Sequence, residues 1–255
     1  MNRKIRSALF LPFGTAFLFL FLTAIRVVPP IGHYRGPYGD VLNAVAVSER
    51  HSTDVVSAVN FDYRGFDTLG EESILFASVI GATLLLRKQS REEKEEPKEE
   101  APQRQVPEMS DAVRILALGL SAPIVLFGIY VVVHGQLTPG GGFQGGLVLA
   151  TVPLMIYLAG DLRVFQKIIS HRLVEFTEAM GIGGFVLIGL AGLVLGGRFL
   201  ENVIPLGPAE VKVYSGGTIA LISFATGMAV TGGFVLLLLA FLEETLELRL
   251  KRRRQ

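Results

Sequence analysis

The sequence predicts an all-α integral membrane protein, and three observations support that prediction. Half of the 255 residues are hydrophobic and only 18% are charged, and the mean hydropathy is +0.49, which is too high for a surface solvated by water. Long runs without Asp, Glu, Lys or Arg recur along the chain, and about 20 apolar helical residues cross a hydrocarbon core of about 30 Å. Basic residues collect in every second loop, as they do in the cytoplasmic loops of multi-pass proteins.

The composition also excludes several classes of function. Lys and Arg number 24 against 23 Asp and Glu, so there is no basic field for binding nucleic acid. Cysteine is absent and histidine occurs four times, which excludes disulfides, iron–sulfur clusters and thiolate zinc sites. We therefore expect no cofactor, no bound metal and no nucleic-acid partner, and we expect the lipid bilayer as the surroundings.

Six runs are candidates for membrane spans. Five are clear, at residues 8–25, 115–133, 143–159, 181–197 and 216–242. The remaining run, residues 73–86, is the second in chain order and covers only about 21 Å as a helix. This helix therefore either thins the bilayer or begins within residues 66–72, and the second option places carboxylates at membrane depth.

The loop charges predict that both termini and the linker at 87–104 lie in the cytoplasm. Lys and Arg precede the first run and also occupy the linker, the loop after the fourth span and the C-terminal tail. The first run has no small-x-small cleavage site before Arg26, which favours a retained helix over a signal peptide.

The six predicted transmembrane helices fall into two modules (2 + 4) that a charged linker joins. The linker is rich in mixed charge and proline and cannot bury a core. The predicted parts are a two-helix membrane module at 1–88, the flexible cytoplasmic linker at 89–110, a four-helix membrane module at 111–245 and a basic cytoplasmic tail at 246–255. Within the outside loop, residues 53–61 are amphipathic, which suits a surface element on the membrane or on a partner, or a buried strand.

A glycine-rich segment separates the third and fourth predicted spans. Its G-x-G-x-x-G match does not indicate a nucleotide site, because both flanks are membrane helices and no βαβ unit follows. Two uses remain open: a tight turn with close packing, or the lining of an ion or water path. We expect Pro139 in the first turn of the next helix and Gly142 against a neighbouring subunit. The motif residues are Pro139, Gly140, Gly141, Gly142, Phe143, Gly145 and Gly146.

An acidic group marks the start of the short second span. Asp67 and Glu71 are four residues apart and share one helix face. A carboxylate drawn toward hydrocarbon indicates a proton or cation site, whereas the alternative is a solvated helix N-terminus that favours acids. Glu71 is preferred over Glu72 because it shares the face of Asp67.

Three further features have competing interpretations. Glu178 is either a proton acceptor or, as we favour, a member of a surface ion pair with Arg172. Gly192 and Gly196 form a GxxxG pattern that predicts close helix packing. His134 is either a hydrogen-bonded interface residue or a proton relay.

These motifs resemble a known family. The run from His134 to Gly146, with the later run from Tyr214 to Thr218, resembles the B-type subunits of multisubunit Na+/H+ antiporters of the Mrp type, a module that also occurs in membrane-bound hydrogenases. The run from Asp62 to Glu71 resembles the C-terminal module of the large Mrp A-type subunit, which is a separate E-type subunit in hydrogenase complexes.

The resemblance implies a non-redox transport subunit, not an enzyme, in the plasma membrane of a prokaryote. Its partners would be the other subunits of an Mrp-type or membrane-bound hydrogenase complex, and its ions would be Na+ and H+. The candidates for the ion path are Asp67, Glu71, Glu72, Glu178 and His134. The alternative is a structural scaffold subunit of a membrane-bound hydrogenase or a related ferredoxin-linked respiratory complex.

Overall fold

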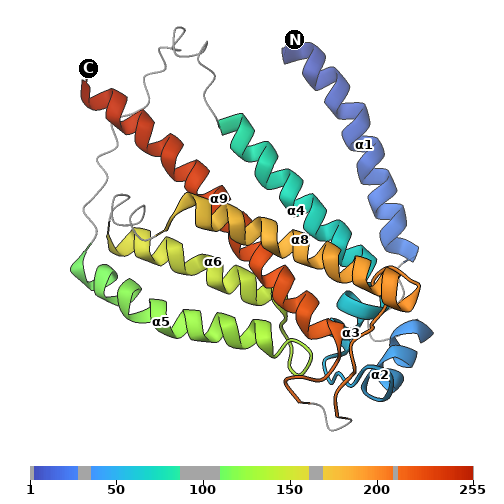
Figure 1. Ribbon diagram of the computed structural model, residues 1–255. Coiled ribbons are helices and arrows are strands. Elements are labelled where there is room, and N and C mark those ends of the chain that lie inside the picture. Colours follow the sequence, from blue (N-terminus) through green and yellow to red (C-terminus); the bar gives the residue numbers. More distant parts are fainter. Residues whose placement is uncertain (1–2, 28–35, 87–109, 161–168, 209–211, 255) are drawn as a thin grey trace. The chain divides into compact units, whose positions relative to one another are not determined.

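The computed structural model is helical, with no strand in the residues that it describes (Figure 1). The chain forms two compact units, residues 1–41 and 42–255, and each is described by itself. The described residues are 3–27, 36–86, 110–160, 169–208 and 212–254.

In the first unit, helix α1 (Arg3–Val27) agrees with the helix expected at 8–25. Its apolar part, Leu11–Arg26, is shorter than the other candidate spans. The hydroxyls of Thr15 and Thr23 donate to backbone carbonyls within the helix, Thr15 to Leu11 at 2.7 Å. These bonds satisfy the polar groups of an otherwise apolar helix.

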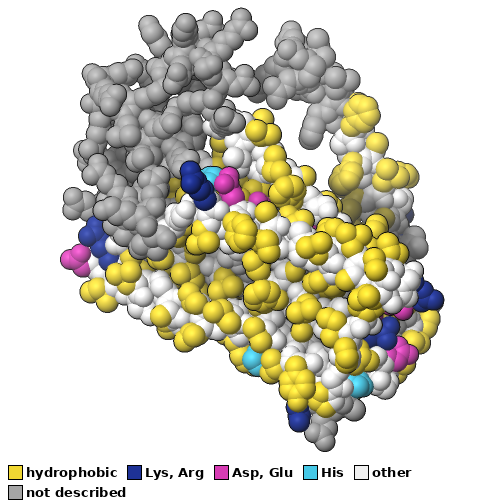
Figure 2. Space-filling view, viewed as in Figure 1, with side chains coloured by type: hydrophobic (Ala, Val, Ile, Leu, Met, Phe, Trp, Pro, Cys, Tyr) yellow, Lys and Arg dark blue, Asp and Glu magenta, His cyan; other side chains and the backbone are white. Residues whose placement is uncertain are grey.

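Five helices of the second unit are long and apolar enough to cross a membrane: α4, α5, α6, α8 and the first part of α9. Apolar side chains cover much of the visible face of the molecule, and the charged ones lie mainly toward its margins (Figure 2). The elements of this unit are the part of α2 (Pro37–Arg50) from Leu42 on, α3 (Val55–Ala58), the π-helix η1 (Val59–Tyr63), α4 (Gly65–Leu86), α5 (Asp111–Val133), α6 (Gly142–Ala159), α8 (His171–Gly196) and α9 (Thr218–Arg254). The protein is therefore a multi-pass membrane protein.

Helix α4 shows how the short run at residues 73–86 becomes long enough to span. It begins at Gly65, so residues 66–72 form its first turns, as the second of the two options expects. The depth of their carboxylates in the membrane stays a prediction. Its 22 residues cover about 33 Å at 1.5 Å per residue.

The segment at 53–61 differs from its sequence interpretation. It forms α3 and the start of η1, so the strand alternative is wrong. The Asp54 carboxylate accepts hydrogen bonds from the backbone N–H and the hydroxyl of Ser57, at 3.2 and 2.7 Å, which caps α3. Ala58 and Phe61 are buried within the unit. Helix α2, just before this segment, was not predicted, because Gly36, Pro37 and Gly39 are residue types typical of turns.

Helix α9 is the centre of the second unit. Half of its spanning window is buried, against 11–33% for the other four spans, and it contacts α4, α5, α6 and α8. Apolar side chains gather around it in two groups. The first cluster contains Ala46, Ala58, Phe61, Phe185, Leu200, Ile219, Ile222 and Ala225. The second cluster contains Val79, Ala150, Val174, Val235, Leu236 and Leu239.

Glycines allow α6 and α8 to approach the backbone of α9. A Cβ added to Gly142 would lie 2.8 Å from the backbone nitrogen of Gly227, and one added to Gly146 would lie 2.8 Å from its carbonyl oxygen. A Cβ on Gly181 would lie 2.6 Å from the carbonyl oxygen of Ala225. Gly142 was expected to face a neighbouring subunit, but it packs inside this chain because α6 lies directly on α9.

The GxxxG pattern of α8 does not face another helix. After α8 the chain folds back, and the Leu200 backbone N–H donates to the Gly189 carbonyl at 3.1 Å. A Cβ on Gly192 would lie 2.6 Å from the Glu201 backbone nitrogen, and one on Gly196 would lie 2.8 Å from the Glu201 carboxylate. These glycines therefore make room for the returning segment.

We expect Gly142→Ala and Gly181→Ala each to destabilise the fold by about 1–3 kcal/mol or more, because the new methyl group overlaps backbone that cannot move aside. Thermal unfolding in detergent, followed by circular dichroism, measures the effect. Gly183→Ala is the matched control, since its Cβ would meet nothing within 4 Å. Equal melting temperatures for all three variants would contradict this packing.

Candidate functional site

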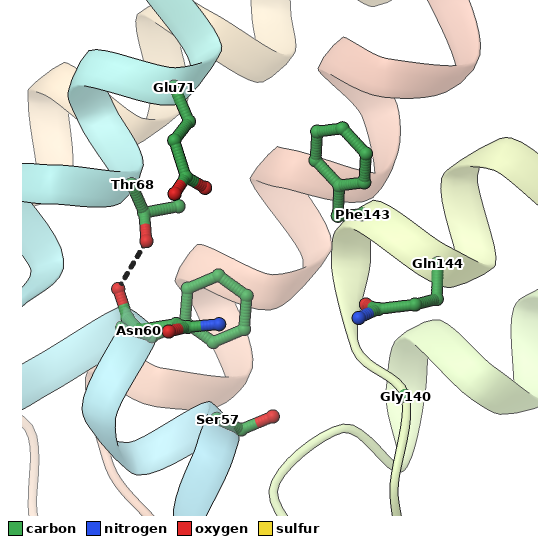
Figure 3. Close-up of a pocket in the computed structure, with 8 residues that line it drawn as sticks. Ser57, Asn60, Thr68, Glu71, Gly140, Phe143 and Gln144 are labelled. Atoms are coloured by element: carbon green, nitrogen blue, oxygen red, sulfur yellow. Dashed lines mark hydrogen bonds between the residues drawn. The ribbon is translucent and has the colours of Figure 1, made fainter. Parts of the chain in front are cut away.

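A pocket of about 170 Å³ lies where the two sequence motifs meet (Figure 3). Its walls come from α3, η1, the start of α4, the loop before α6 and the first turn of α6. The lining residues are Ser57, Asn60, Phe61, Thr68, Glu71, Gly140, Phe143 and Gln144. The acidic motif and the glycine-rich motif, far apart in the sequence, thus form one site.

Oxygen atoms prevail among the polar groups of the pocket. The Thr68 hydroxyl donates to the Asn60 carbonyl at 2.6 Å, which joins α4 to η1. The Glu71 carboxylate and the Gln144 amide extend from opposite walls toward the space between them (Figure 3). Of the lining side chains only Glu71 carries a charge, so the pocket presents one carboxylate and several neutral oxygens.

Two consecutive glycines lie in the loop before α6, and the first of them, Gly140, lines the pocket. Gly140 and Gly141 have φ angles of 147° and 106°, a region that side-chain-bearing residues rarely adopt. A Cβ on Gly141 would lie 3.4 Å from both the Phe61 ring and the Ser57 hydroxyl. This loop therefore closes against α3 and η1 because it has no side chains.

These φ angles also determine where α6 begins. The helix starts at Gly142, so Pro139 lies in the preceding loop and not in the first helical turn as predicted. Farther along α6, a Cβ on Gly145 would lie 2.9 Å from the Gly128 carbonyl of α5. The later glycines confirm the packing use, and Gly140 and Phe143 line the pocket. The lining of an ion or water path stays a prediction.

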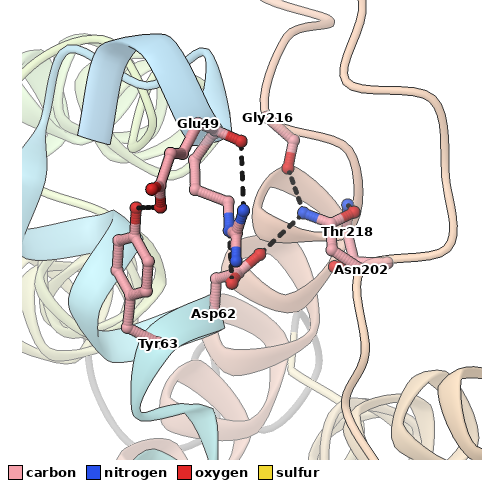
Figure 4. Close-up of polar contacts among 7 residues, drawn as sticks. Glu49, Asp62, Tyr63, Asn202, Gly216 and Thr218 are labelled. Carbon is pink, nitrogen blue, oxygen red and sulfur yellow. Dashed lines mark hydrogen bonds and ion pairs between the residues drawn. The ribbon is translucent and has the colours of Figure 1, made fainter. Parts of the chain in front are cut away.

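A polar network holds η1 in position (Figure 4). Asp62 accepts from the Arg50 Nε at 2.6 Å and from the Asn202 amide at 2.8 Å. The same amide donates to the Gly216 carbonyl at 3.0 Å, and the Asn202 oxygen accepts the Thr218 backbone N–H at 2.9 Å. Asn202 thus ties η1 to the first turn of α9.

Gln136 holds the loop before α6 against the start of α3. Its backbone carbonyl accepts from the N–H groups of Thr53 and Asp54, at 3.1 and 3.2 Å, and from the Ser52 hydroxyl at 2.9 Å. Its buried side-chain amide donates to the Val213 carbonyl. One residue therefore connects three loops around the pocket.

The three acids of the first motif occupy different surroundings. Glu71 lines the pocket. Asp67 is exposed, forms an ion pair with Arg64 and does not line the pocket. Glu72, ranked below Glu71 from the sequence, is 1% exposed and lies outside the pocket lining.

The two candidates of the second module also lie outside the pocket. Glu178 was expected in a surface ion pair with Arg172, which is wrong: it is 6% exposed because it shares the buried face of α8 with Val174. The His134 ring stacks on Tyr130 with centroids 4.2 Å apart, and its Nδ1 lies 3.1 Å from the Tyr130 carbonyl. His134 thus ends α5 through a local contact.

Sequence reasoning missed the neutral part of the site. Gln144 lies inside the glycine-rich motif and is the one polar side chain there that is followed by glycines, a signal that could have identified it. Ser57, Asn60 and Thr68 are common polar residues in ordinary surroundings, and Asn202 has no local signal.

The family is shown by comparison with known proteins. Residues 112–236 match a domain related to the MnhB subunit of Na+/H+ antiporter. An uncharacterized protein of Methanocaldococcus jannaschii is 31% identical over 206 residues, which cover 75% of this chain and 78% of that protein. The chain thus contains an MnhB-related domain and belongs to the same family as this Methanocaldococcus jannaschii protein.

Other members and structural neighbours share this similarity. The MnhB-related chain is 36% identical over 81 residues to the B-type subunit of the Na+/H+ antiporter of Alkalihalophilus pseudofirmus, over 31% of this chain and 54% of that protein. It thus spans about half the length of that curated relative. A chain of the membrane-bound sulfane sulfur reductase, an archaeal respiratory membrane complex, aligns with a TM-score of 0.69 at 30% identity, over 93% of this chain and 98% of that one. A chain of the Mrp complex from a Dietzia species shares the fold, with a TM-score of 0.70 at 23% identity, over 95% of this chain and 26% of that one.

Two groups beside the pocket have shifted pKa values. Burial, the hydrogen bond to Glu49 at 2.9 Å and the charge of Glu49 raise the pKa of Tyr63 from 10.0 to about 12, against the opposing charge of Arg50. Arg50 lies 4.8 Å from the Tyr63 ring centroid. Partial burial alone would lower the pKa of Arg50, but the hydrogen bond and charge of Asp62 raise it above its ordinary value.

We expect the Tyr63 phenol to titrate near pH 12, and not near pH 10. Because the folded protein binds this proton more tightly, the resulting stabilisation is complete below pH 10 and is lost as the pH rises toward 12. The difference in tyrosinate absorbance between the wild type and Tyr63→Phe measures the midpoint. In Glu49→Gln the midpoint should fall, and a wild-type midpoint at the ordinary value for tyrosine would contradict the burial of this phenol.

Proposed function

We propose that the chain is a B-type membrane subunit of a multisubunit Na+/H+ antiporter and that the pocket at Glu71 lies on the cation path. The observation that carries this proposal is the joining of the two motifs at one pocket. The matches to antiporter subunits support the class of complex. The transported ions and the neighbouring subunits belong to the proposal.

The chemistry of the pocket suits a monovalent cation. Oxygen donors from carboxylate, hydroxyl, amide and carbonyl groups replace part of the hydration shell of such ions. One carboxylate balances one positive charge. Among the described residues no three His, Asp or Glu side chains gather into a metal site, so the pocket favours a singly charged ion over a transition metal.

The proposal includes the fusion of two modules, an N-terminal one like the end of the Mrp A-type subunit and a C-terminal B-type one. The alignment with the reductase chain supports a single polypeptide for both parts, because it covers 93% of this chain. The linker at 89–110 lies almost wholly outside the described residues, and the division at 1–88, 111–245 and 246–255 stays a prediction.

The second candidate is a structural scaffold subunit of a respiratory membrane complex related to the membrane-bound hydrogenases. It is favoured by the match to the sulfane sulfur reductase complex, of which one chain is covered over 98% of its length. In that case the chain holds neighbouring subunits and moves no ion.

Glu71→Gln separates the two candidates. We expect this variant to lower cation-dependent proton exchange in membrane vesicles by about tenfold or more, because a lost charge-assisted contact of about 1.5–3 kcal/mol corresponds to at least that factor in affinity. Complex recovery on a native gel should be unchanged, since the Glu71 side chain is exposed.

Glu175→Gln is the matched control, because Glu175 is exposed and pairs with His171 on α8. It should leave both exchange and recovery unchanged. Full exchange in assembled Glu71→Gln complexes would overturn the cation role and favour the scaffold.

The proposed topology has six spans, α1 and the five long apolar helices of the second unit, with both termini and the linker at 87–104 in the cytoplasm. The alternation of basic loops supports it. This places the pocket, at the opposite end of α4 from the linker, toward the outer surface.

Protease added to sealed right-side-out vesicles should leave the linker intact, because the membrane shields it. The same protease should cut it after permeabilisation, which serves as the positive control. Cleavage in sealed vesicles would reverse the orientation and move the pocket to the cytoplasmic side.

A further inference from the structure

Two buried carboxyl groups lie outside the pocket. Glu72 on α4 is 1% exposed and Glu178 on α8 is 6% exposed. Both oxygens of Glu72 and the Oε1 of Glu178 have no hydrogen-bond partner among the described residues. Acidic side chains are almost never this buried without a partner unless they have a function.

On α4, Glu72 lies between the two apolar clusters. Leu69, three residues before it, packs against the first cluster. Leu75, three residues after it, and Val79, seven after it, belong to the second cluster or pack against it. Glu72 shares this face of α4 with them, so its carboxyl lies in the layer between the clusters.

On α8, Glu178 lies between the same clusters. Val174, four residues before it, belongs to the second cluster, and Phe185, seven residues after it, belongs to the first. A Cβ added to Gly232 of α9 would lie 2.6 Å from the Glu178 backbone nitrogen. The absence of a side chain at Gly232 therefore lets α8 approach closely enough to bury this carboxyl.

The Glu178 carboxyl points to the contact between α4 and α9. A Cβ added to Gly233 would lie 3.0 Å from the Glu178 Oε1 and 3.4 Å from the Val79 Cγ2. Glu72 lies on the same face of α4 as Val79, about 10 Å away along the helix. The two acids are therefore found along one line of contact, which we name the α4–α9 seam and define by Glu72, Val79, Gly233 and Glu178.

The charges around the seam disfavour two carboxylate ions. In the described part of α4 and in α9 up to Leu242 there is no Lys, Arg or His. Glu71 lies beside Glu72 and is a further acid. On α8 the charged residues before Glu178 are exposed: Arg172 lies six residues before it, and Glu175 pairs with His171 at 3.3 Å. An unpaired carboxylate in such surroundings is costly, whereas a protonated carboxyl is neutral and can donate.

We propose that Glu72 and Glu178 are proton-binding carboxyl groups that form a proton path along the α4–α9 seam, separate from the cation pocket at Glu71. This inference rests on the proposed exchange function. In each step a carboxylate oxygen takes a proton from a water molecule on one side and later releases it to a water molecule on the other. Only O–H bonds form and break, and each carboxyl returns to its starting state.

Reaction with N,N′-dicyclohexylcarbodiimide tests the protonated state directly. A protonated carboxyl in apolar surroundings transfers its proton to the reagent nitrogen, its oxygen attacks the central carbon, and the adduct rearranges to a stable N-acylurea. Mass spectrometry of the intact complex after labelling and digestion locates the adducts. We expect adducts on Glu72 and Glu178, and none on the exposed Glu175.

The dependence of carbodiimide labelling on pH and on Na+ distinguishes the acids of the seam from the acid of the pocket. Labelling of the seam acids should decline as the pH rises, because the carboxylate does not react. A large excess of Na+ should leave the labelling unchanged, because the cation binds elsewhere. Absence of adducts on both acids, or protection of both by Na+, would overturn the proposal.

Glu178→Gln tests transport through the seam. In assembled complexes it should abolish proton exchange, Glu178→Asp should restore part of it, and Glu175→Gln should leave it unchanged. Gly233→Ala should also slow exchange, because its methyl group crowds the Glu178 carboxyl, whereas Gly183→Ala should not.

The outcomes separate this inference from the proposed function. Exchange that is lost in Glu71→Gln but retained in Glu178→Gln and Gly233→Ala would support the cation role of the pocket and overturn the proton path along the seam. Exchange retained in Glu71→Gln but lost in Glu178→Gln, with both adducts present, would support the seam and overturn the cation role of the pocket. Because labelling uses the wild type, failure of a variant to assemble does not weaken the test.

Discussion

Close backbone approach to α9 is the constraint on which the second unit depends. Lipid is as apolar as leucine, so burying large side chains between membrane helices adds little driving force, and contact through small residues does more. Gly142 and Gly146 of α6 and Gly181 of α8 all lie within overlap distance of the α9 backbone once a Cβ is added. With these helices fixed so closely, the larger side chains are confined to two clusters and leave a layer between them.

The pocket follows from the same constraint together with two polar connections. Gly142 fixes the first turn of α6 on α9, so Phe143 and Gln144 lie in the pocket wall. Asn202 ties Asp62 of η1 to the start of α9, and Gln136 ties α3 to the loop before α6. Every wall of the pocket is thereby held by α9 or by its neighbours, although the lining residues come from distant parts of the chain.

The neighbouring acidic residues Glu71 and Glu72 differ in how far the rest of the protein buries them. Helix α4 presents successive residues Glu71 and Glu72 to different surroundings, because neighbours on a helix lie about 100° apart. Glu71 is exposed and lines the pocket, and Glu72 is buried between the two apolar clusters. One helix thus serves a site suited to a cation and a site suited to a proton, and the two remain separated by the helix itself.

The sequence by itself determined that the chain is helical and where its long apolar helices lie, and it singled out the acidic and glycine-rich motifs that line the pocket. These features depend on local composition and spacing. Only the tertiary structure decided that the motifs meet, that Glu72 and Glu178 are buried, and that Gly192 and Gly196 face a returning segment instead of a helix. Helical period assigns residues to a common face but does not say what covers that face. Contacts such as Asn202 with Asp62, 140 residues apart, have no local signal because the partner comes into reach only when the helices have packed.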